Sequence, residues 1–168
     1  MRIQELMSKP AVTCSQDDSL DTAARLMWEN DCGTVPVLGD DGKVVGILTD
    51  RDICMAAYTQ GRPLSAIRAA TAMARQVYSC QPNEAIEAAE ELMADKHVRR
   101  LPVVDAEGHP VGVLSLNDLA RSVTSAGKND GAQRGVVRTL AAICEPRGHR
   151  ARPKTKAEER ESSALVAF

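Results

Sequence analysis

Residues 7–52 of this chain are similar to residues 73–118, at a constant offset of 66, and this duplication limits the possible folds more than any other feature. The aligned pairs, which need no gap, include Met7 with Met73, Cys14 with Cys80, Pro36 with Pro102, Gly46 with Gly112 and Asp52 with Asp118. Because so many identities at one offset are hard to obtain by chance, we infer two copies of one structural unit. We therefore expect two similar halves with two equivalent sites.

Both copies predict the same order of elements: strand, helix, strand, strand, helix. Leu20, Ala23 and Met27 lie on one helical face, after a polar cluster of the kind that caps a helix. Short apolar runs separated by turn residues then predict a hairpin. The expected segments are 12–14, 20–27, 35–38, 44–48 and a helix from 49 onward in the first copy, with 78–80, 86–93, 101–104, 111–114 and a helix from 115 onward in the second.

Pro36 and Pro102 fall inside the predicted hairpin strands. Proline has no backbone N–H to donate, so we expect these strands at a sheet edge or at an interruption of the ladder. We divide the chain into a first repeat (6–60), a linker (61–72), a second repeat (73–125) and a C-terminal region (126–168). That region predicts a loop, a helix over 136–144 and a basic, disordered tail.

The composition predicts a globular protein with an aliphatic core. Hydrophobic residues make up 43% and aromatic residues 2% of the chain, so Val, Ile, Leu, Met and Ala must fill the interior, and we expect Trp28 to pack as well. No apolar run approaches the ~20 residues of a membrane span, and the start has no signal-peptide pattern. We therefore expect a cytoplasmic protein.

Charge and cysteine usage argue against nucleic-acid and metal-binding functions. From Lys128 onward there are nine Lys and Arg against five Asp and Glu, while the whole chain has a net charge of −2, so an acidic body precedes a basic tail. None of the five cysteines forms a C-x-x-C pair, and the histidines show no ligand spacing with them. We expect reduced, buried thiols and no metal.

A hydroxyl followed three residues later by a carboxylate ends the hairpin of each copy, as Thr49 with Asp52 and as Ser115 with Asp118. A helix N-terminus offers unpaired N–H groups to a phosphate, and the hydroxyl adds a donor. The carboxylate would instead accept from both hydroxyls of a ribose. A structural alternative is that the hydroxyls only cap helices. The recurrence of the pattern favours a ligand site.

The order of elements, the Leu101-Pro102-Val103-Val104-Asp105 strand and the Gly-x-x-Thr/Ser-x-x-Asp segments resemble a tandem pair of CBS (cystathionine β-synthase) domains over about residues 6–125. The resemblance implies an α/β (α+β) Bateman module, in which two β-α-β-β-α repeats pack through their sheets with pseudo-two-fold symmetry. It implies two clefts that bind AMP, ADP or ATP, a homodimer, and regulation of a protein target that the sequence does not identify. No cofactor is expected.

The predicted nucleotide-binding residues form three groups. They are Asp52 and Asp118 for the ribose; Thr49, Ser115, Arg51, Arg99 and Arg100 for phosphate; and Thr13, Ser79, Gly46, Gly112, Pro36 and Pro102 for the base and cleft. The glycines would let a flat base approach a strand end closely. In related modules a basic residue just before the proline strand contacts phosphate. Because residues 97–100 carry cations and the matching residues 31–34 carry none, we predict unequal clefts.

Three other functions compete with nucleotide sensing. The first is an interaction protein with vestigial clefts, in which residues 132–168 dock a partner; the missing cation of the first copy favours it. The second is an enzyme, but no Ser-His-Asp grouping, zinc signature, Walker loop or dinucleotide fingerprint is present, so we expect no catalysis. The third is nucleic-acid binding through the basic tail, which lacks aromatic residues for base stacking.

Overall fold

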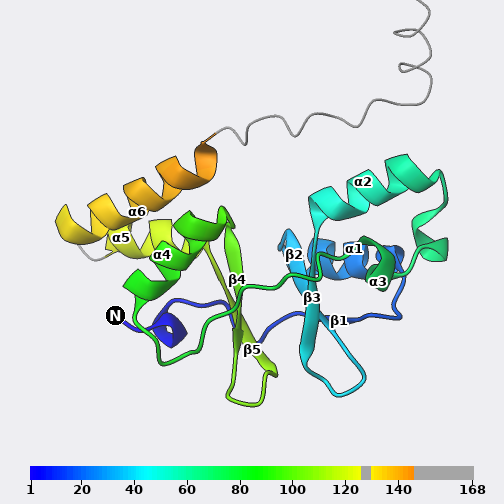
Figure 1. Cartoon of the computed structure of the whole chain (residues 1–168), viewed down its shortest axis with the longest axis horizontal. Helices are drawn as coiled ribbons and strands as arrows, with labels where there is room; N and C mark the ends of the chain where they lie inside the picture. The colour runs from blue at the N-terminus through cyan, green and yellow to red at the C-terminus, as the bar shows by residue number, and fades with distance from the viewer. Residues whose placement is uncertain (126–129, 146–168) are drawn as a thin grey trace, which may run out of the picture.

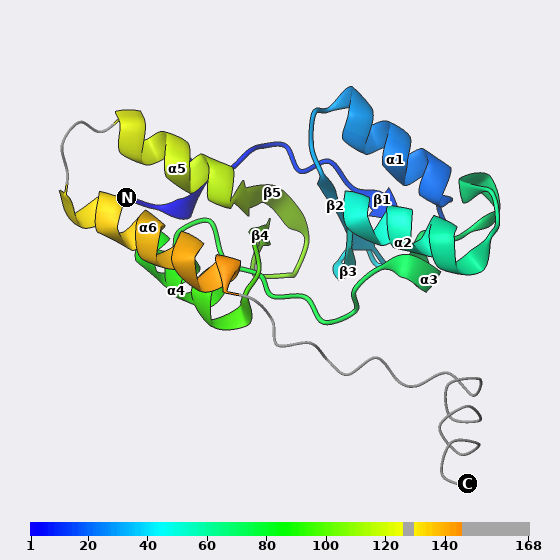
Figure 2. The ribbon, with the colours of Figure 1, turned by 90° about the horizontal axis from the view of Figure 1, so that it is seen from above.

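Two similar halves lie side by side, with their strands toward the middle of the molecule and their helices outside (Figures 1 and 2). The computed structural model of the chain describes residues 1–125 and 130–145. The first half contains β1 (Cys14–Ser15), α1 (Leu20–Glu29), β2 (Thr34–Leu38), β3 (Val44–Thr49) and α2 (Asp50–Gln60), and the second contains α4 (Ile86–Lys96), β4 (Arg100–Val104), β5 (Pro110–Ser115) and α5 (Leu116–Ser125). The expected strand–helix–strand–strand–helix order is therefore confirmed in the first half.

Four further elements flank the two halves. They are the short helices η1 (Ile3–Glu5), η2 (Leu64–Ala66) and α3 (Ala69–Ala72), and the longer α6 (Asp130–Cys144). Helix α6 begins six residues earlier than the sequence predicted, and α5 extends to Ser125, so it includes the first two residues of the loop expected over 124–131. The predicted tail after residue 145 lies outside the described residues.

Local signals explain where the repeat helices begin. Ser19 caps α1 by accepting a hydrogen bond from the Thr22 N–H at 3.2 Å, and the apolar face that begins at Leu20 is buried beneath the helix. Helix α4 buries the equivalent face through Ile86 and Met93. The helical period of the apolar residues therefore decides which side of each helix faces its sheet.

The two proline strands meet the expectation in different ways: β4, with Pro102, is an edge strand of its two-stranded sheet, whereas β2, with Pro36, is not. Strand β2 is the middle strand of the sheet β1-β2-β3, so the predicted edge position is wrong for Pro36. However, β1 pairs only with Val37 and Leu38, and Pro36 lies outside that short ladder, where its missing N–H leaves no bond unmade. In the second half the sheet has two strands, β4 and β5, and the strand expected over 78–80 is reduced to one bridge between Cys80 and Val103.

The segment before each repeat packs on the opposite half. At the chain start, the Ile3 N–H donates to the Glu84 carbonyl at 3.1 Å, so η1 completes the second half. In the linker, the Ala69 N–H donates to the Asp18 carbonyl at 2.8 Å, so α3 completes the first half. The linker over 61–72 is therefore part of the first half's structure and not a spacer.

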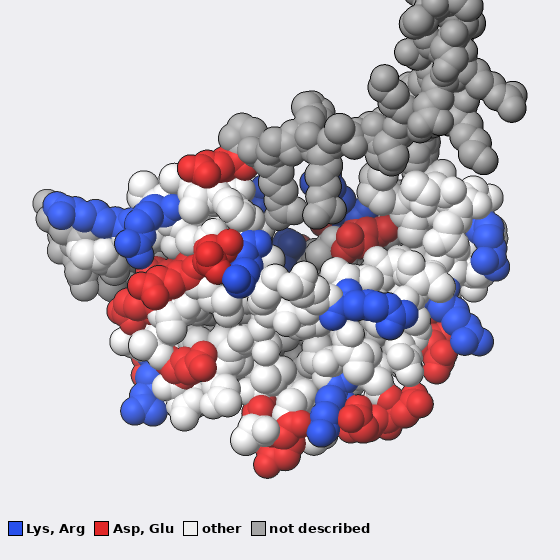
Figure 3. Space-filling model, in the orientation of Figure 1, with Lys and Arg blue, Asp and Glu red and all other residues white. Residues whose placement is uncertain are grey.

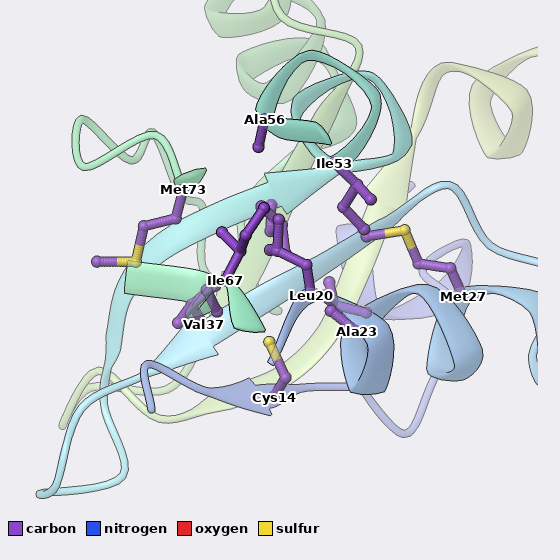
Figure 4. Packing of buried hydrophobic residues seen from close by; sticks show 12 residues of the cluster. Cys14, Leu20, Ala23, Met27, Val37, Ile53, Ala56, Ile67 and Met73 are labelled. Atoms are coloured by element: carbon purple, nitrogen blue, oxygen red, sulfur yellow. The ribbon is translucent and has the colours of Figure 1, made fainter. Parts of the chain in front are cut away.

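Each half has its own aliphatic core, as the composition predicted. Figure 4 shows the first core, where Leu20 and Ile67 pack near the sheet and Met27 lies close to Ile53. The second core gathers buried residues from η1, α4, β4, β5 and α5. Burial of each large aliphatic side chain contributes roughly 1.5–3 kcal/mol.

Two side-chain predictions need correction. Trp28 is 88% exposed, because it lies on the outer side of α1, next to but not on the face that carries Met27. All five cysteines are unpaired, but Cys54 and Cys144 are exposed. The two expected buried thiols are confirmed: burial raises the pKa of Cys14 to about 11 and that of Cys80 to about 12. Within the described residues, no helix is both long and apolar enough to span a membrane.

Candidate ligand-binding site

A pocket of about 800 Å³ opens between the two halves, beside the start of α2. Figure 3 shows the hollow along the upper edge of the molecule, with basic and acidic side chains inside it. Five parts of the chain line the pocket: the start of β2, the end of β3 with the start of α2, the segment that enters the second repeat, the loop that leads into β4, and the end of α6. Both repeats therefore contribute to one site.

The start of α2 brings Thr49, Arg51 and Asp52 into the pocket, as the sequence predicted for one cleft. The Thr49 hydroxyl donates to Asp52 Oδ2 at 2.6 Å and the Thr49 N–H donates to the same oxygen at 2.9 Å, while the Asp52 N–H donates back to Thr49 Oγ1 at 3.2 Å. This is a capping box, so the structural role of both residues is real. Asp52 Oδ1 accepts no hydrogen bond from any described residue and can accept from a ligand.

The loop before β4 and the first residue of that strand bring Arg99 and Arg100 to the same pocket. Helix α4 ends at His97, whose φ of 52° is left-handed, and the chain then turns toward the first half. A cation is therefore present opposite the first copy's hydroxyl–carboxylate pair, and the expectation that this cleft lacks one is wrong. Sequence alignment of the copies missed it because the cations come from the other repeat.

Gly33 shows how closely the two halves approach. A Cβ on Gly33 would lie 3.0 Å from Nη2 of Arg100 and 2.9 Å from Oδ2 of Asp50. Both side chains therefore reach across the bare backbone of Gly33 from different repeats. The lack of a side chain at this position lets an arginine of the second repeat meet the α2 start of the first.

The segment that enters the second repeat contributes Gln76 and Tyr78, which the sequence did not single out. The predicted cleft residue Ser79 is exposed and does not line this pocket, because consecutive side chains of an extended segment point to opposite sides. Its counterpart Thr13 is also absent from the lining. The Tyr78 ring has Lys96 Nζ 5.6 Å from its centroid. In the sequence, the only indication that Tyr78 lines the pocket was its place next to Ser79, the residue predicted for the cleft.

The end of α6 supplies the remaining wall through Ile143, Cys144 and Glu145. The duplication cannot reveal these residues, since they lie beyond the second copy. The charged side chains of the lining are balanced: Arg51, Arg99 and Arg100 against Asp50, Asp52 and Glu145. Such a lining suits a ligand that carries both an anionic group and hydrogen-bond donors.

The second hydroxyl–carboxylate pair has the same local geometry but different surroundings. The Ser115 hydroxyl donates to Asp118 Oδ2 at 2.6 Å, and the Ser115 N–H donates to it at 2.8 Å. Asp118 is only 4% exposed, and its other oxygen accepts from the Arg121 guanidinium. Neither Ser115 nor Asp118 lines the pocket described here. The two pairs are therefore not brought together in one site.

The glycines predicted to admit a base have another role. A Cβ on Gly46 would collide with the Met73 side chain, and one on Gly112 would lie 2.8 Å from the Ser8 carbonyl oxygen. The space beside both glycines is filled by the segments exchanged between the halves, so it is not open to a flat base. Pro36 and Pro102 are buried in their hairpins.

No group of three or more His, Cys, Asp or Glu residues in the described part of the chain is arranged to hold a metal ion. The polar side chains that line the pocket carry hydroxyl, carboxylate, guanidinium, amide, imidazole and thiol groups. These groups bind small polar molecules through hydrogen bonds and charge.

Two copies of one α/β repeat with a polar pocket between them define a two-repeat module with a candidate ligand site. The chain belongs to the CBS domain family: the CBS domain model matches residues 3–58 and 67–125.

Related proteins and structures agree with this assignment. The chain is 36% identical to the CBS domain-containing protein YhcV of Bacillus subtilis, over 70% of this chain and 82% of that protein. It is 32% identical to hypoxic response protein 1 of Mycobacterium tuberculosis, over 80% of this chain and 89% of that protein. The CBS domain pair of protein MJ0100, solved with 5′-methylthioadenosine and S-adenosyl-L-methionine, is similar with a TM-score of 0.66 and 25% identity, over 73% of this chain and 98% of that chain.

Proposed function

We propose that this protein is a non-catalytic regulatory module that binds an adenosine nucleotide (AMP, ADP or ATP) between its two repeats and modulates a partner. The observation that carries the proposal is the convergence of Arg99 and Arg100 from one repeat with Thr49 and Asp52 from the other on one pocket. The adenosine-containing ligands of the similar MJ0100 domain pair support the choice of ligand class.

Each part of such a ligand has a matching group in the pocket. Arg51, Arg99 and Arg100 would bind phosphate, since guanidinium groups form charge-assisted hydrogen bonds with its oxygens. The open oxygen of Asp52 would accept from the ribose hydroxyls. Tyr78 would offer apolar surface to the adenine ring.

The coupling to a partner follows from the position of the ligand between the repeats. A ligand that contacts both halves favours whichever relative arrangement lets both contacts form. Two copies would form the working unit: Trp28 and Tyr58 are 88% and 80% exposed on the helices of the first half, where a second copy could cover them. Light scattering tests this homodimer.

A second candidate is an interaction protein that no longer binds a nucleotide at the second copy's hydroxyl–carboxylate pair, Ser115 and Asp118. Its support is the Asp118–Arg121 ion pair, which occupies the carboxylate that a ribose would need. In that case the chain would bind its protein partner through its helices without a physiological nucleotide.

Calorimetric titration of ligand-stripped protein with AMP, ADP and ATP, beside GMP as a control for the base, distinguishes the two candidates. If the protein senses nucleotides, we expect saturable binding of at least one adenosine nucleotide at one site per chain, and weaker binding of GMP. No binding of any adenosine nucleotide would falsify nucleotide sensing and favour the interaction protein.

A further inference from the structure

Helix α6 breaks the symmetry of the two halves. The CBS domain model ends at residue 125, and α6 begins at Asp130. In the first half, α2 ends at Gln60 and is capped by Gly61, whose φ of 60° is left-handed, and the chain turns back as η2 and α3 onto the first half itself. The described part of the chain therefore contains no first-half counterpart of α6.

Helix α6 docks closely on the second half. Thr139 is 1% exposed, and Ile143 belongs to the second core. Gly135 allows the close approach: a Cβ there would lie 2.5 Å from Oε2 of Glu90 on α4. The docked position is therefore set by fitted contacts along one face of the helix.

The end of α6 is tied to the segment that carries the pocket arginines. The Nδ1 atom of His97 lies 2.9 Å from the Ala142 carbonyl oxygen of α6, a hydrogen-bond distance at which the ring N–H donates. His97 is followed directly by Val98, Arg99 and Arg100. Beyond this contact, Cys144 and Glu145 line the pocket itself. One end of α6 therefore both holds the arginine segment and forms a wall of the site.

We propose that the ligand site extends beyond the two repeats onto α6, with Cys144 and Glu145 beside the bound ligand, and that docking of α6 on α4 favours ligand binding. The inference rests on the proposed function, because it concerns the ligand of the same pocket. When α6 leaves its place, the pocket loses a wall and the arginine segment loses the His97 contact. By thermodynamic reciprocity, a bound ligand also favours the docked helix.

The wild-type protein allows a first test through thiol chemistry. Cys144 and Cys54 are both exposed, but only Cys144 lines the pocket, whereas Cys14 and Cys80 are buried. Alkylation by iodoacetamide is followed by mass spectrometry of the Cys144 and Cys54 peptides, with and without saturating AMP, ADP and ATP in turn. We expect the nucleotide that binds to slow Cys144 modification at least about fivefold, the low end of common coupling factors, and to leave Cys54 unchanged.

A pair of α6 variants tests the docking. Gly135→Leu places a bulky side chain against Glu90 and is expected to displace α6, whereas Ala141→Leu adds the same side chain at an exposed position of the same helix. Calorimetry should give about tenfold weaker nucleotide binding for Gly135→Leu and wild-type binding for Ala141→Leu. Circular dichroism and thermal unfolding establish that both variants fold, and the wild-type alkylation result needs no variant.

The outcomes separate the two proposals. If the wild-type protein binds a nucleotide, but Cys144 reacts at the same rate with and without it and Gly135→Leu binds as wild type does, the role of α6 is refuted while nucleotide sensing stands. If the wild-type protein binds none of the three nucleotides, both proposals fail together.

Discussion

The starts of α2 and α5 are two copies of one capping box placed in different surroundings. In both, a hydroxyl and a carboxylate three residues apart exchange the same hydrogen bonds, with the hydroxyl-to-carboxylate distance at 2.6 Å in each. At α2, Asp52 keeps one oxygen open and lines the pocket. At α5, Asp118 is buried and paired with Arg121.

A single position accounts for much of this difference. Arg121 follows Asp118 by three residues, so the two side chains are neighbours on the helix surface. The matching residue of the first copy is Met55, which cannot pair with Asp52. Duplication therefore preserved the backbone geometry, while a change one turn later decided which carboxylate remains open to a ligand.

The largest effect should come from the arginines that the second repeat contributes to the pocket. Replacement of Arg99 and Arg100 together by Ala removes two charge-assisted contacts with phosphate, and we expect nucleotide affinity to fall about 100-fold in calorimetry. Arg25→Ala, at an exposed ion pair on α1, is the control and should bind normally. Equal loss in both variants would mean that general charge, and not the pocket, governs binding.

The exchanged segments should make the two strand glycines sensitive to any side chain. We expect Gly112→Ala to cost about 2 kcal/mol in the free energy of unfolding, as overpacked positions do, because the added Cβ would meet a backbone oxygen. Gly46→Ala should cost less, since the collision there is mainly with the flexible Met73 side chain. Urea denaturation measures both, and the reverse order would show that the halves do not pack as described.

The two aspartates should separate binding from stability. Asp52→Asn removes the charge that would face the ribose, and we expect about tenfold weaker nucleotide binding. Asp118→Asn should leave affinity for this pocket unchanged and lower the melting temperature, because the neutral amide no longer forms an ion pair with Arg121. Calorimetry and thermal unfolding of both variants give the comparison; equal affinities would remove Asp52 from the site.

Exchanging Met55 and Arg121, which follow Asp52 and Asp118 by three residues, should change which of the two carboxylates is open to a ligand. Met55→Arg places a cation three residues after Asp52, where it can pair with the open carboxylate. We expect nucleotide binding to weaken about fivefold, which corresponds to the free energy of one hydrogen bond that is exposed to solvent. The reciprocal Arg121→Met should leave this pocket's affinity unchanged. Should Met55→Arg instead strengthen binding, its guanidinium contacts phosphate and Asp52 remains open.

The smallest effect concerns the carboxyl group beneath α6. Burial, followed by the nearby charge of Glu87, raises the pKa of Glu90 above its ordinary value of 4.5, while Arg138 on α6 opposes the shift. The folded state therefore loses stability as the pH rises from 4.5 toward the raised pKa. Glu90→Gln removes the loss, so its melting temperature should exceed that of wild type at pH 7 and match it near pH 4. Glu91→Gln, on the exposed side of α4, should show no such pH dependence.

Local patterns predicted local structure well. Helix α1 begins at Leu20 and α4 at Ile86, where the apolar period starts, and both hairpins lie where the proline-containing runs indicated. The predictions that failed depended on distant contacts. The exposure of Trp28 and the space beside Gly46 depend on what packs against them, and no neighbouring residue reports that.

The amino-acid sequence by itself determined the duplication, the positions of the repeat helices and hairpins, and the family, since each depends on residues a few positions apart or on one fixed offset. Tertiary structure alone decided that Arg99 and Arg100 face the start of α2, that the segments before the repeats fill the space beside Gly46 and Gly112, and that α6 closes one side of the pocket. The physical reason is that these contacts join segments far apart in the chain, and spacing along a sequence does not specify which distant surfaces meet.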